Sequence, residues 1–311
     1  YKQINNLTIV MYHYVRDIAS SRFPNIAGLE ISGFCRQLDY LNSHFEILDM
    51  NDVIESILHG SKLPENGCLL TFDDGYKDHI DFVLPELLKR NLTGSFFPPC
   101  TVLSNDNILD VNAIHYILAS HTDKNALVKE LFSYCKEVGI SENRLNELWR
   151  KNSIASRFDT GEVIFFKRML QHLLPNEIRK SLIKTFFSVY IDMSPREFAN
   201  MLYLSMSDVS TLLSEGMFIG SHTANHPWLN TLNYEEQTTE INLSLEFLKM
   251  IGAASENWVM CYPYGAYNQD TLDILKSQNC VMGLTTEVGV ANMQSSDLLK
   301  LKRFDTNDFP Q

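Results

Sequence analysis

Short apolar runs alternate with amphipathic segments along most of this chain, and this alternation predicts its secondary structure. Residues 7–15, 68–72 and 93–97 are runs rich in β-forming side chains, which are typical of buried strands. Residues 78–90, between the last two runs, have the character of a helix. A strand, a helix and a strand at this pitch form a βαβ unit, so the pattern predicts a parallel sheet.

The same alternation returns towards the end of the chain. The further predicted strands cover residues 217–221, 258–262 and 281–285, and the helices around them cover residues 207–215, 234–251 and 270–278. Together these segments give about six to eight strands separated by helices, which indicates an α/β protein with an open or closed (β/α) barrel. The active site of such a barrel lies at the C-terminal ends of its strands.

The middle of the chain, residues 104–204, has a different pattern. It has few β-like runs and several amphipathic helical ones, such as residues 126–137 and 165–174. We therefore expect one domain over residues 1–311, with a helical insertion at 104–204. This insertion could form a lid or a surface for a homo-oligomer.

Charge and composition narrow the classes of partner. The chain of 311 residues has a formal net charge of −12 and no cluster of Lys and Arg, which argues against nucleic-acid binding. A neutral or amine-bearing substrate fits this charge better than an acidic polymer. No apolar run is long enough to span a membrane, and the polar residues 1–6 do not resemble a signal peptide. We expect a cytoplasmic protein, although a chain that begins with Tyr leaves room for a removed leader.

Two groups of residues at predicted strand ends suggest catalytic chemistry. Asp73 and Asp74 follow a strand and precede a glycine, where they form either a plain turn or a pair of functional carboxylates. His222 and His226 have the i, i+4 spacing that places two side chains on one face of a helical turn. Two imidazoles and a carboxylate are a ligand set that suits zinc, although Co, Ni, Mn or Fe could also bind there. The alternative is two ordinary histidines.

Three motifs in this order resemble the polysaccharide deacetylase family, also called NodB-like or carbohydrate esterase family 4. The first, T-F-D-D-G, is complete as Thr71–Gly75, and the second, H-[S/T]-x-x-H, is complete as His222–His226. Part of the third, R-x-P-Y-[G/S], is present as Pro263-Tyr264-Gly265. The resemblance implies a distorted (β/α) barrel of about seven parallel strands that removes the N-acetyl group of an amino sugar.

The resemblance also implies roles for particular residues. Asp74, His222 and His226 would bind a divalent metal ion, and Asp73 would act as the general base. The backbone N–H of Tyr264 would stabilise the oxyanion of the transition state.

The chain departs from the family pattern at two places. The family has Arg where this chain has Cys261, and we expect Arg303 to supply the missing guanidinium unless it is a surface residue. The family's late histidine, its general acid, is also absent, because no histidine follows His226. His13, at the end of the first predicted strand, is our candidate for that acid, with Asp73 and His115 as alternatives.

Trp228 and Pro263 are candidate substrate contacts, since aromatic side chains often stack on sugar rings; a core role is the alternative for Trp228. We expect an acetylated sugar as the substrate, such as an intermediate of surface-polysaccharide synthesis, with a wall polymer or a chitin-like oligomer as the alternative. Two alternative functions are the hydrolysis of another C–N bond, such as that of a cyclic imide, and a sugar-binding relic without turnover.

Overall fold

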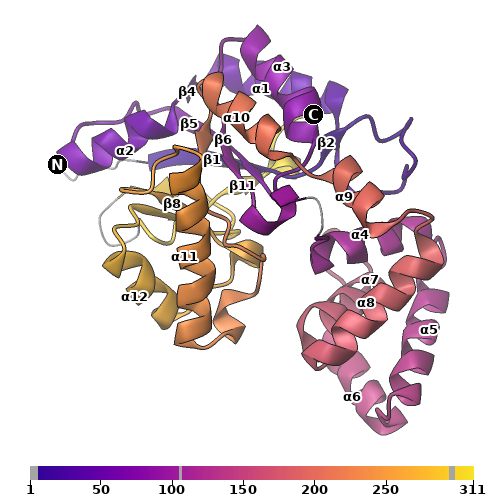
Figure 1. Ribbon diagram of the computed structural model, residues 1–311. Helices are drawn as coiled ribbons and strands as arrows, with labels where there is room; N and C mark the ends of the chain where they lie inside the picture. The colour runs from indigo at the N-terminus through magenta and orange to yellow at the C-terminus, as the bar shows by residue number, and fades with distance from the viewer. Residues whose placement is uncertain (1–5, 105–106, 294–297) are drawn as a thin grey trace. The chain divides into compact units, whose positions relative to one another are not determined.

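The computed structural model describes residues 6–104, 107–293 and 298–311, and the chain divides into two compact units (Figure 1). Unit 1 consists of Tyr1–Asp17, Gly28–Asn107 and Ala199–Gln311. Unit 2 consists of Ile18–Ala27 and Ile108–Phe198. Most of the segment expected to be a helical insertion, residues 104–204, therefore lies in unit 2. Whether it is an insertion into a single deacetylase-like domain remains a prediction.

Unit 1 contains a sheet in which most neighbouring strands are parallel. Its strands are β1 (Asn6–Tyr12), β4 (Glu46–Ile47), β5 (Gly67–Asp73), β6 (Ser95–Phe97), β7 (Phe218–Ile219), β10 (Ala291–Asn292) and β11 (Phe304–Asp305). The order is β10-β1-β5-β6-β7, with β11 also paired to β1 and β4 to β5. Only β10 is antiparallel to its neighbour among these pairs of described residues. The predicted parallel α/β architecture is thus confirmed.

Two smaller sheets complete the strands described in unit 1. They pair β2 (Val15–Arg16) with β3 (Leu29–Glu30), and β8 (Val259–Cys261) with β9 (Met282–Leu284), in parallel. Single parallel bridges, Ser221 with Met260 and Leu284 with Leu301, extend the pairing from β7 to β8 and from β9 to the segment before β11. Closure into a barrel of about seven parallel strands remains a prediction.

The helices of unit 1 follow the predicted pattern closely. They are α1 (Ile31–His44), α2 (Met50–His59), α3 (Leu84–Lys89), α10 (Met206–Ser214), α11 (Tyr234–Met250) and α12 (Gln269–Ser277). Side chains of Ser205, Asn233 and Asn268 cap the first turns of α10, α11 and α12. The helix expected at residues 78–90 differs, because its first part is a π-helix, His79–Val83. Such π-turns are frequent at functional sites.

Unit 2 is helical. Its helices are α4 (Asp110–Ser120), α5 (Lys124–Glu137), α6 (Glu142–Asn152), α7 (Gly161–Arg168) and α8 (Asn176–Tyr190), and α9 (Pro195–Leu202) crosses the boundary of the two units in the sequence. Aromatic side chains form much of its interior; for example, Phe166 packs edge-on against Phe186. The loop of residues 18–27 also joins this unit, through an edge-on contact of Phe23 with Tyr116. No pattern in the sequence predicts that contact.

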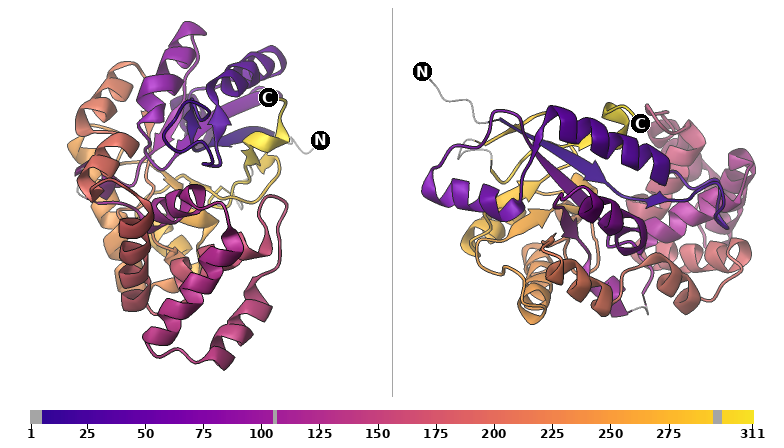
Figure 2. Two further views of the ribbon diagram at one scale, coloured as in Figure 1. Left: turned by 90° about the vertical axis from the view of Figure 1, so that its right-hand side faces the viewer. Right: turned by 90° about the horizontal axis from the view of Figure 1, so that it is seen from above.

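Alternation along the strands decides which side chains face the interior of unit 1. Leu69 of β5 belongs to the buried core together with Val259 and Cys261 of β8. Phe72 faces the other way and stacks on Tyr12, and both contact α1, which runs along the strands (Figure 2). Successive side chains of a strand point to opposite faces. Asp73, four residues after Leu69, therefore lies on the inner face at the C-terminal end of β5.

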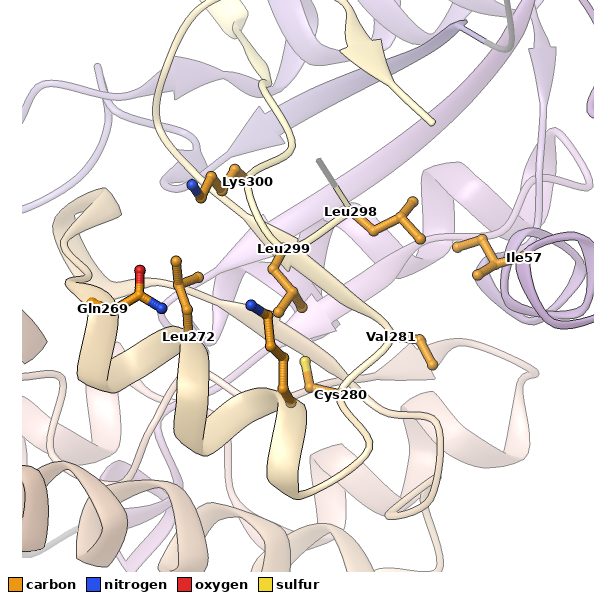
Figure 3. Close-up of a pocket in the computed structure, with 9 residues that line it drawn as sticks. Ile57, Gln269, Leu272, Cys280, Val281, Leu298, Leu299 and Lys300 are labelled. Atoms are coloured by element: carbon orange, nitrogen blue, oxygen red, sulfur yellow. The ribbon is translucent and has the colours of Figure 1, made fainter. Parts of the chain in front are cut away.

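A surface pocket lies along helix α12 (Figure 3). It is lined by residues of α12, among them Gln269 and Lys276, and by Cys280 and Val281, which come directly before β9. None of the residues expected to form the active site lines it. Among the helices described, none combines the length and the apolar composition needed to span a membrane.

Candidate metal and catalytic site

The turn after β5 sends two neighbouring carboxylates in different directions. Asp73 is the last residue of the strand, and Asp74 has a positive φ of 73°. The N–H of Asp74 donates to the carbonyl of Phe97 on the neighbouring strand at 3.1 Å. Gly75 is required next, because it has a φ of 67° and a Cβ there would lie 2.8 Å from the Cβ of Pro98. The two carboxylates therefore have different partners, Arg303 for Asp73 and the two histidines for Asp74.

Asp74 lies against both histidines of the second motif. Its Oδ1 is 3.0 Å from Nε2 of His222 and 3.2 Å from Nε2 of His226. Its Oδ2 accepts a hydrogen bond of 2.7 Å from the hydroxyl of Tyr76. All four side chains are buried. The structure therefore brings together the three residues expected to bind a metal ion.

The predicted helical turn that carries the two histidines is wrong. Residues 222–228 form an irregular loop, in which Thr223 has a φ of 62° and His226 a φ of 56°. Pro227 follows His226, and a residue before proline is disfavoured in the α conformation. The loop nevertheless turns both imidazoles towards Asp74, partly because the N–H of His226 donates to Oγ1 of Thr223 at 3.1 Å.

Helix α11 holds this histidine loop from outside. Oε2 of Glu240 accepts hydrogen bonds from the N–H groups of Ala224 and Asn225, at 3.0 and 2.9 Å. Oε1 accepts another from the side-chain amide of Asn225 at 2.7 Å. A side chain without a part in any motif thus fixes the backbone between the two histidines.

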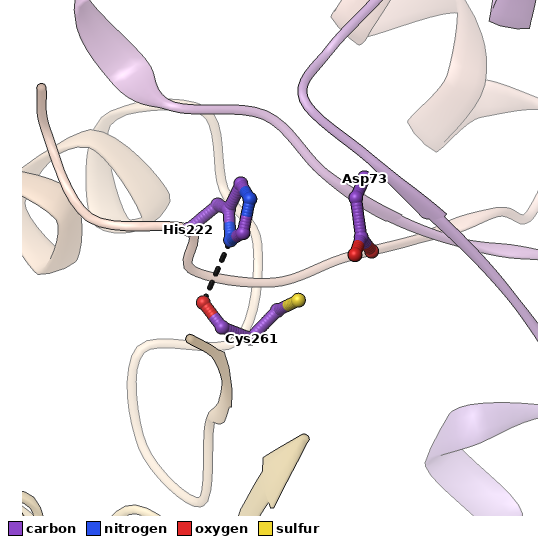
Figure 4. A group of neighbouring side chains, drawn as sticks. All are labelled: Asp73, His222 and Cys261. Carbon is purple, nitrogen blue, oxygen red and sulfur yellow. Dashed lines mark hydrogen bonds between the residues drawn. The ribbon is translucent and has the colours of Figure 1, made fainter. Parts of the chain in front are cut away.

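The three buried donors fit a divalent metal ion. Nδ1 of His222 lies 2.7 Å from the carbonyl oxygen of Cys261, which can only accept, so Nδ1 carries a proton and Nε2 is the nitrogen that a metal ion could bind (Figure 4). One ligand atom from each of Asp74, His222 and His226 lies within 4.8 Å of the others. Burial raises the pKa of Asp74, but hydrogen bonds with both imidazoles hold it well below its ordinary value. The carboxylate is therefore ready as an anionic ligand.

Arg303 forms a bidentate ion pair with Asp73. Its Nη1 and Nη2 lie 2.9 and 2.8 Å from the two carboxylate oxygens, and both side chains are buried. Nε donates to the carbonyl of Thr285 at 2.8 Å, and Nη1 also donates to Oγ1 of Thr71 at 3.1 Å. Burial alone would raise the pKa of Asp73, but the guanidinium lowers it to about 2. Arg303 is therefore no surface residue, and it keeps Asp73 ionised.

Cys261 lies beside this ion pair on the inner face of β8. Ligand atoms of Asp73, His222 and Cys261 lie within 4.8 Å of one another (Figure 4). The pKa of the Cys261 thiol is raised by burial, so the thiol stays neutral. This second group does not suit a cation, because the same carboxylate is already paired with Arg303.

His13 reaches the other side of Asp73. Its Nε2 is 3.7 Å from Oδ2 of Asp73, and its side chain is 38% exposed. The carbonyl of His13 accepts a hydrogen bond from Nε2 of His79 at 3.0 Å, and the N–H of Val15 donates to Asp78 at 3.1 Å. The structure thus places a partly exposed imidazole next to the candidate base. His115, the weaker candidate, belongs to unit 2.

An aromatic pair borders the metal ligands. The ring of Tyr264 stacks on Trp228 with centroids 4.4 Å apart and meets His226 edge-on at 4.6 Å. Both Trp228 and Tyr264 are partly exposed, whereas Pro263 is buried. Trp228 is thus partly accessible beside the metal ligands and Pro263 is not, and the substrate contacts expected of both remain predictions.

Sequence reasoning missed two residues that contact the site. Tyr76 directly follows the T-F-D-D-G motif, so its position beside Asp74 could have been suspected from adjacency. Glu240 lies 14 residues after His226 on a helix that the pattern did predict. Nothing in the local sequence of that helix sets Glu240 apart from the other acidic residues.

Residues 149–283 match the model of the polysaccharide deacetylase family. This matched segment contains His222, His226 and Tyr264. A stretch of 90 residues is 30% identical to YxkH of Bacillus subtilis (strain 168), which its name assigns to the polysaccharide deacetylases. This stretch covers 29% of the chain and 32% of the length of that relative. The resemblance expected from the three motifs is thus confirmed.

Two solved structures have a similar fold over nearly the whole chain. The deacetylase PplD of Streptococcus pyogenes, in complex with acetate, has a TM-score of 0.58 and 18% identity, and the match covers 97% of this chain and 93% of PplD. IcaB from Ammonifex degensii has a TM-score of 0.57 and 16% identity, with 96% and 91% covered. At these identities the likeness establishes the α/β fold.

Proposed function

We propose that this chain is a metal-dependent hydrolase that removes the N-acetyl group of an amino sugar in a glycan or glycan precursor. It carries the first two motifs of the polysaccharide deacetylases complete and the third in part. The observation that carries this proposal is the pair of neighbouring carboxylates with separate partners. Asp74 faces two imidazoles, and Asp73 faces a guanidinium. Binding a sugar would not need a buried base next to a metal site, so the arrangement favours catalysis over a sugar-binding relic.

Asp74, His222 and His226 would hold the metal ion, and zinc is the ion that best suits two imidazoles and one carboxylate. A divalent ion with three protein ligands acidifies bound water and polarises a carbonyl group. His222 is held in the required tautomer by the carbonyl of Cys261, and the loop that carries His226 is fixed by Glu240.

Asp73 would act as the general base. Its carboxylate is ionised and cannot rotate, because both of its oxygens accept hydrogen bonds from Arg303. The guanidinium also limits the basicity of Asp73, so Asp73 would need an acidified water as its proton donor, which is the chemistry that a bound metal ion would supply. Arg303 is then a positioning residue that replaces the Arg of the family's third motif.

The leaving amine needs a proton, and His13 would supply it. Its Nε2 lies 3.7 Å from Oδ2 of Asp73, and its side chain is 38% exposed, so a substrate could reach it. Asp73, once protonated, is the alternative donor. The backbone N–H of Tyr264 would stabilise the oxyanion that forms at the acetyl carbonyl.

The aromatic pair of Trp228 and Tyr264 would contact the sugar. The stacked rings border His226, and flat aromatic faces suit the apolar face of a pyranose ring. A net charge of −12 favours a neutral acetylated sugar, or its amine product, over an acidic polymer. A surface-polysaccharide intermediate is a substrate of this kind.

The experiment is acetate release from oligosaccharides of N-acetylglucosamine by the zinc-loaded protein, with Asp73→Asn as the matched variant. We expect the wild type to release acetate and Asp73→Asn to retain zinc but to lose about 10²- to 10⁴-fold in kcat. Equal rates for the two proteins would refute the role of Asp73. Turnover of a cyclic imide such as succinimide, without acetate release from any acetylated sugar, would favour the other C–N hydrolase.

A further inference from the structure

The two oxygens of the Asp74 carboxylate have different surroundings. Oδ1 faces both imidazole nitrogens, at 3.0 and 3.2 Å. Oδ2 faces the hydroxyl of Tyr76 at 2.7 Å. A carboxylate only accepts hydrogen bonds, so the phenol donates and occupies the side of Oδ2 that it faces.

The Tyr76 hydroxyl is itself held in place. The side chain is fully buried, and its ring stacks on Tyr14 with centroids 4.2 Å apart. The edge of the ring meets His79 at a centroid distance of 5.7 Å. The backbone of Tyr76 also forms an antiparallel bridge with Tyr203. A ring fixed from several sides holds its hydroxyl in one position relative to Asp74.

We propose that Tyr76 is a positioning residue for the metal centre, which restricts Asp74 to ligation through Oδ1 alone and thereby raises the affinity for a tetrahedral ion. This inference rests on the proposed metal site but not on the identity of the substrate. A carboxylate can bind a metal ion through one oxygen or through both, and the second mode suits larger ions with more ligands. With Oδ2 bonded to Tyr76, the one-oxygen mode is favoured.

The two histidine ligands differ in whether their second ring nitrogen has a hydrogen-bond partner. His222 donates from Nδ1 to the carbonyl of Cys261. Nδ1 of His226 is buried and has no hydrogen-bond partner among the residues described. Partners of this kind orient metal ligands, and their loss commonly weakens metal binding about 10- to 100-fold. Among the described residues, the bonds from Tyr76 to Asp74 and from His222 to Cys261 thus link ligand side chains to groups outside the ligand set.

The test compares Tyr76→Phe with Tyr12→Phe. Each change removes one buried hydroxyl and keeps the ring in its aromatic stack. The hydroxyl of Tyr12 has no hydrogen-bond partner among the described residues, so its removal is a matched control. Circular dichroism of the metal-free proteins checks that both variants are folded. The dissociation constants for Zn²⁺ and Co²⁺ are then measured by competition with a chelating dye.

We expect Tyr76→Phe to bind Zn²⁺ about 10- to 100-fold more weakly than the wild type, and Tyr12→Phe to bind it as the wild type does. The visible absorption of bound Co²⁺ should also weaken in Tyr76→Phe alone, because an ion that gains a second carboxylate oxygen is no longer tetrahedral. A simple packing defect would not change that spectrum.

Unchanged affinity and an unchanged Co²⁺ spectrum in Tyr76→Phe would overturn the inference and leave the proposed deacetylase intact. If the wild type binds neither Zn²⁺ nor Co²⁺, the protein has no such metal centre, and both this inference and the proposed deacetylase are refuted. Equal weakening in the two variants would show that the loss comes from packing of the aromatic rings, which also overturns the inference.

Discussion

Backbone strain at single residues is concentrated at the site. Seven residues other than glycine have a positive φ in the described chain, and three of them, Asn91, Asn257 and Asn279, are asparagines, which tolerate this conformation. The other four belong to the three motifs: Asp74, Thr223, His226 and Tyr264. Each such residue costs about 1–3 kcal/mol and persists only where its surroundings enforce it. This distribution indicates that the four conformations serve the site rather than the stability of the fold.

The ion pair of Arg303 and Asp73 gives a prediction at the same scale. Arg303→Met should lower the free energy of unfolding by about 3–5 kcal/mol, because it leaves the Asp73 charge buried and unpaired. The double variant Asp73→Asn/Arg303→Met removes both charges and should regain a large part of that loss. Urea denaturation of the metal-free proteins measures both values. If the double variant is no more stable than Arg303→Met, the two charges do not depend on each other.

The residues of the site differ in how far the sequence revealed them. The motifs identified Asp73, Asp74, His222 and His226, because each lies at or near a predicted strand end. Arg303 was inferred from the family resemblance, since the family has an Arg where this chain has Cys261, and a cysteine cannot form a charge-assisted bond to a carboxylate. The burial of Pro263 could not be inferred, because it depends on the three-dimensional course of the turn that contains it.

At the scale of elements, apolar periodicity located most strands and helices but not the geometry of their connections. The strand expected at residues 68–72 is β5, Gly67–Asp73, and the helix expected at 234–251 is α11, Tyr234–Met250. Two-residue strands such as β10 and β11 have no periodicity to detect. The loop of His222 and His226 was mistaken for a helical turn, because i, i+4 spacing does not reveal the hydrogen bonds that hold an irregular loop.

The contact between α11 and this loop gives the prediction for this scale. Glu240→Ala removes three hydrogen bonds to Ala224 and Asn225 and should weaken zinc binding about 10- to 100-fold, since the loop positions two ligands. Glu240→Gln keeps an acceptor oxygen and should lose less. Glu246→Ala, an exposed position on the same helix, is the control and should bind zinc as the wild type does. Zinc affinity that is equal in Glu240→Ala and Glu246→Ala would contradict this role of α11.

At the scale of the whole molecule, the candidate site lies entirely in unit 1. Every residue assigned to the metal site, to the base and to its neighbours belongs to that unit, although these residues come from segments on both sides of unit 2 in the sequence. The C-terminal ends of parallel strands bring these residues together, which is why their positions at the ends of predicted strands could be used to predict the site. None of the three motifs lies in unit 2, so the motifs do not indicate its role.

The stability of the molecule should depend on pH through His79. Burial lowers the pKa of His79 from 6.5 to about 4, so the folded protein stays unprotonated there while the unfolded chain takes up a proton. Because the unfolded state binds more protons between these pH values, the free energy of unfolding should fall as the pH decreases from 6.5 to 4, by up to about 1.4 kcal/mol per pH unit. His79→Gln should reduce this slope, and His44→Gln, at an exposed site, should not. Denaturation curves at several pH values measure it, and equal slopes in all three proteins would rule out His79.

The most direct test of a metal-dependent enzyme is the metal content of the purified protein, measured by elemental analysis for the wild type and for His222→Ala/His226→Ala. With Asp74, His222 and His226 as ligands, the wild type should hold about one transition-metal ion per chain after equilibration with zinc, and the double variant should hold none. A wild type that remains metal-free after exposure to zinc and cobalt would contradict the deacetylase mechanism and leave the sugar-binding relic as the better description.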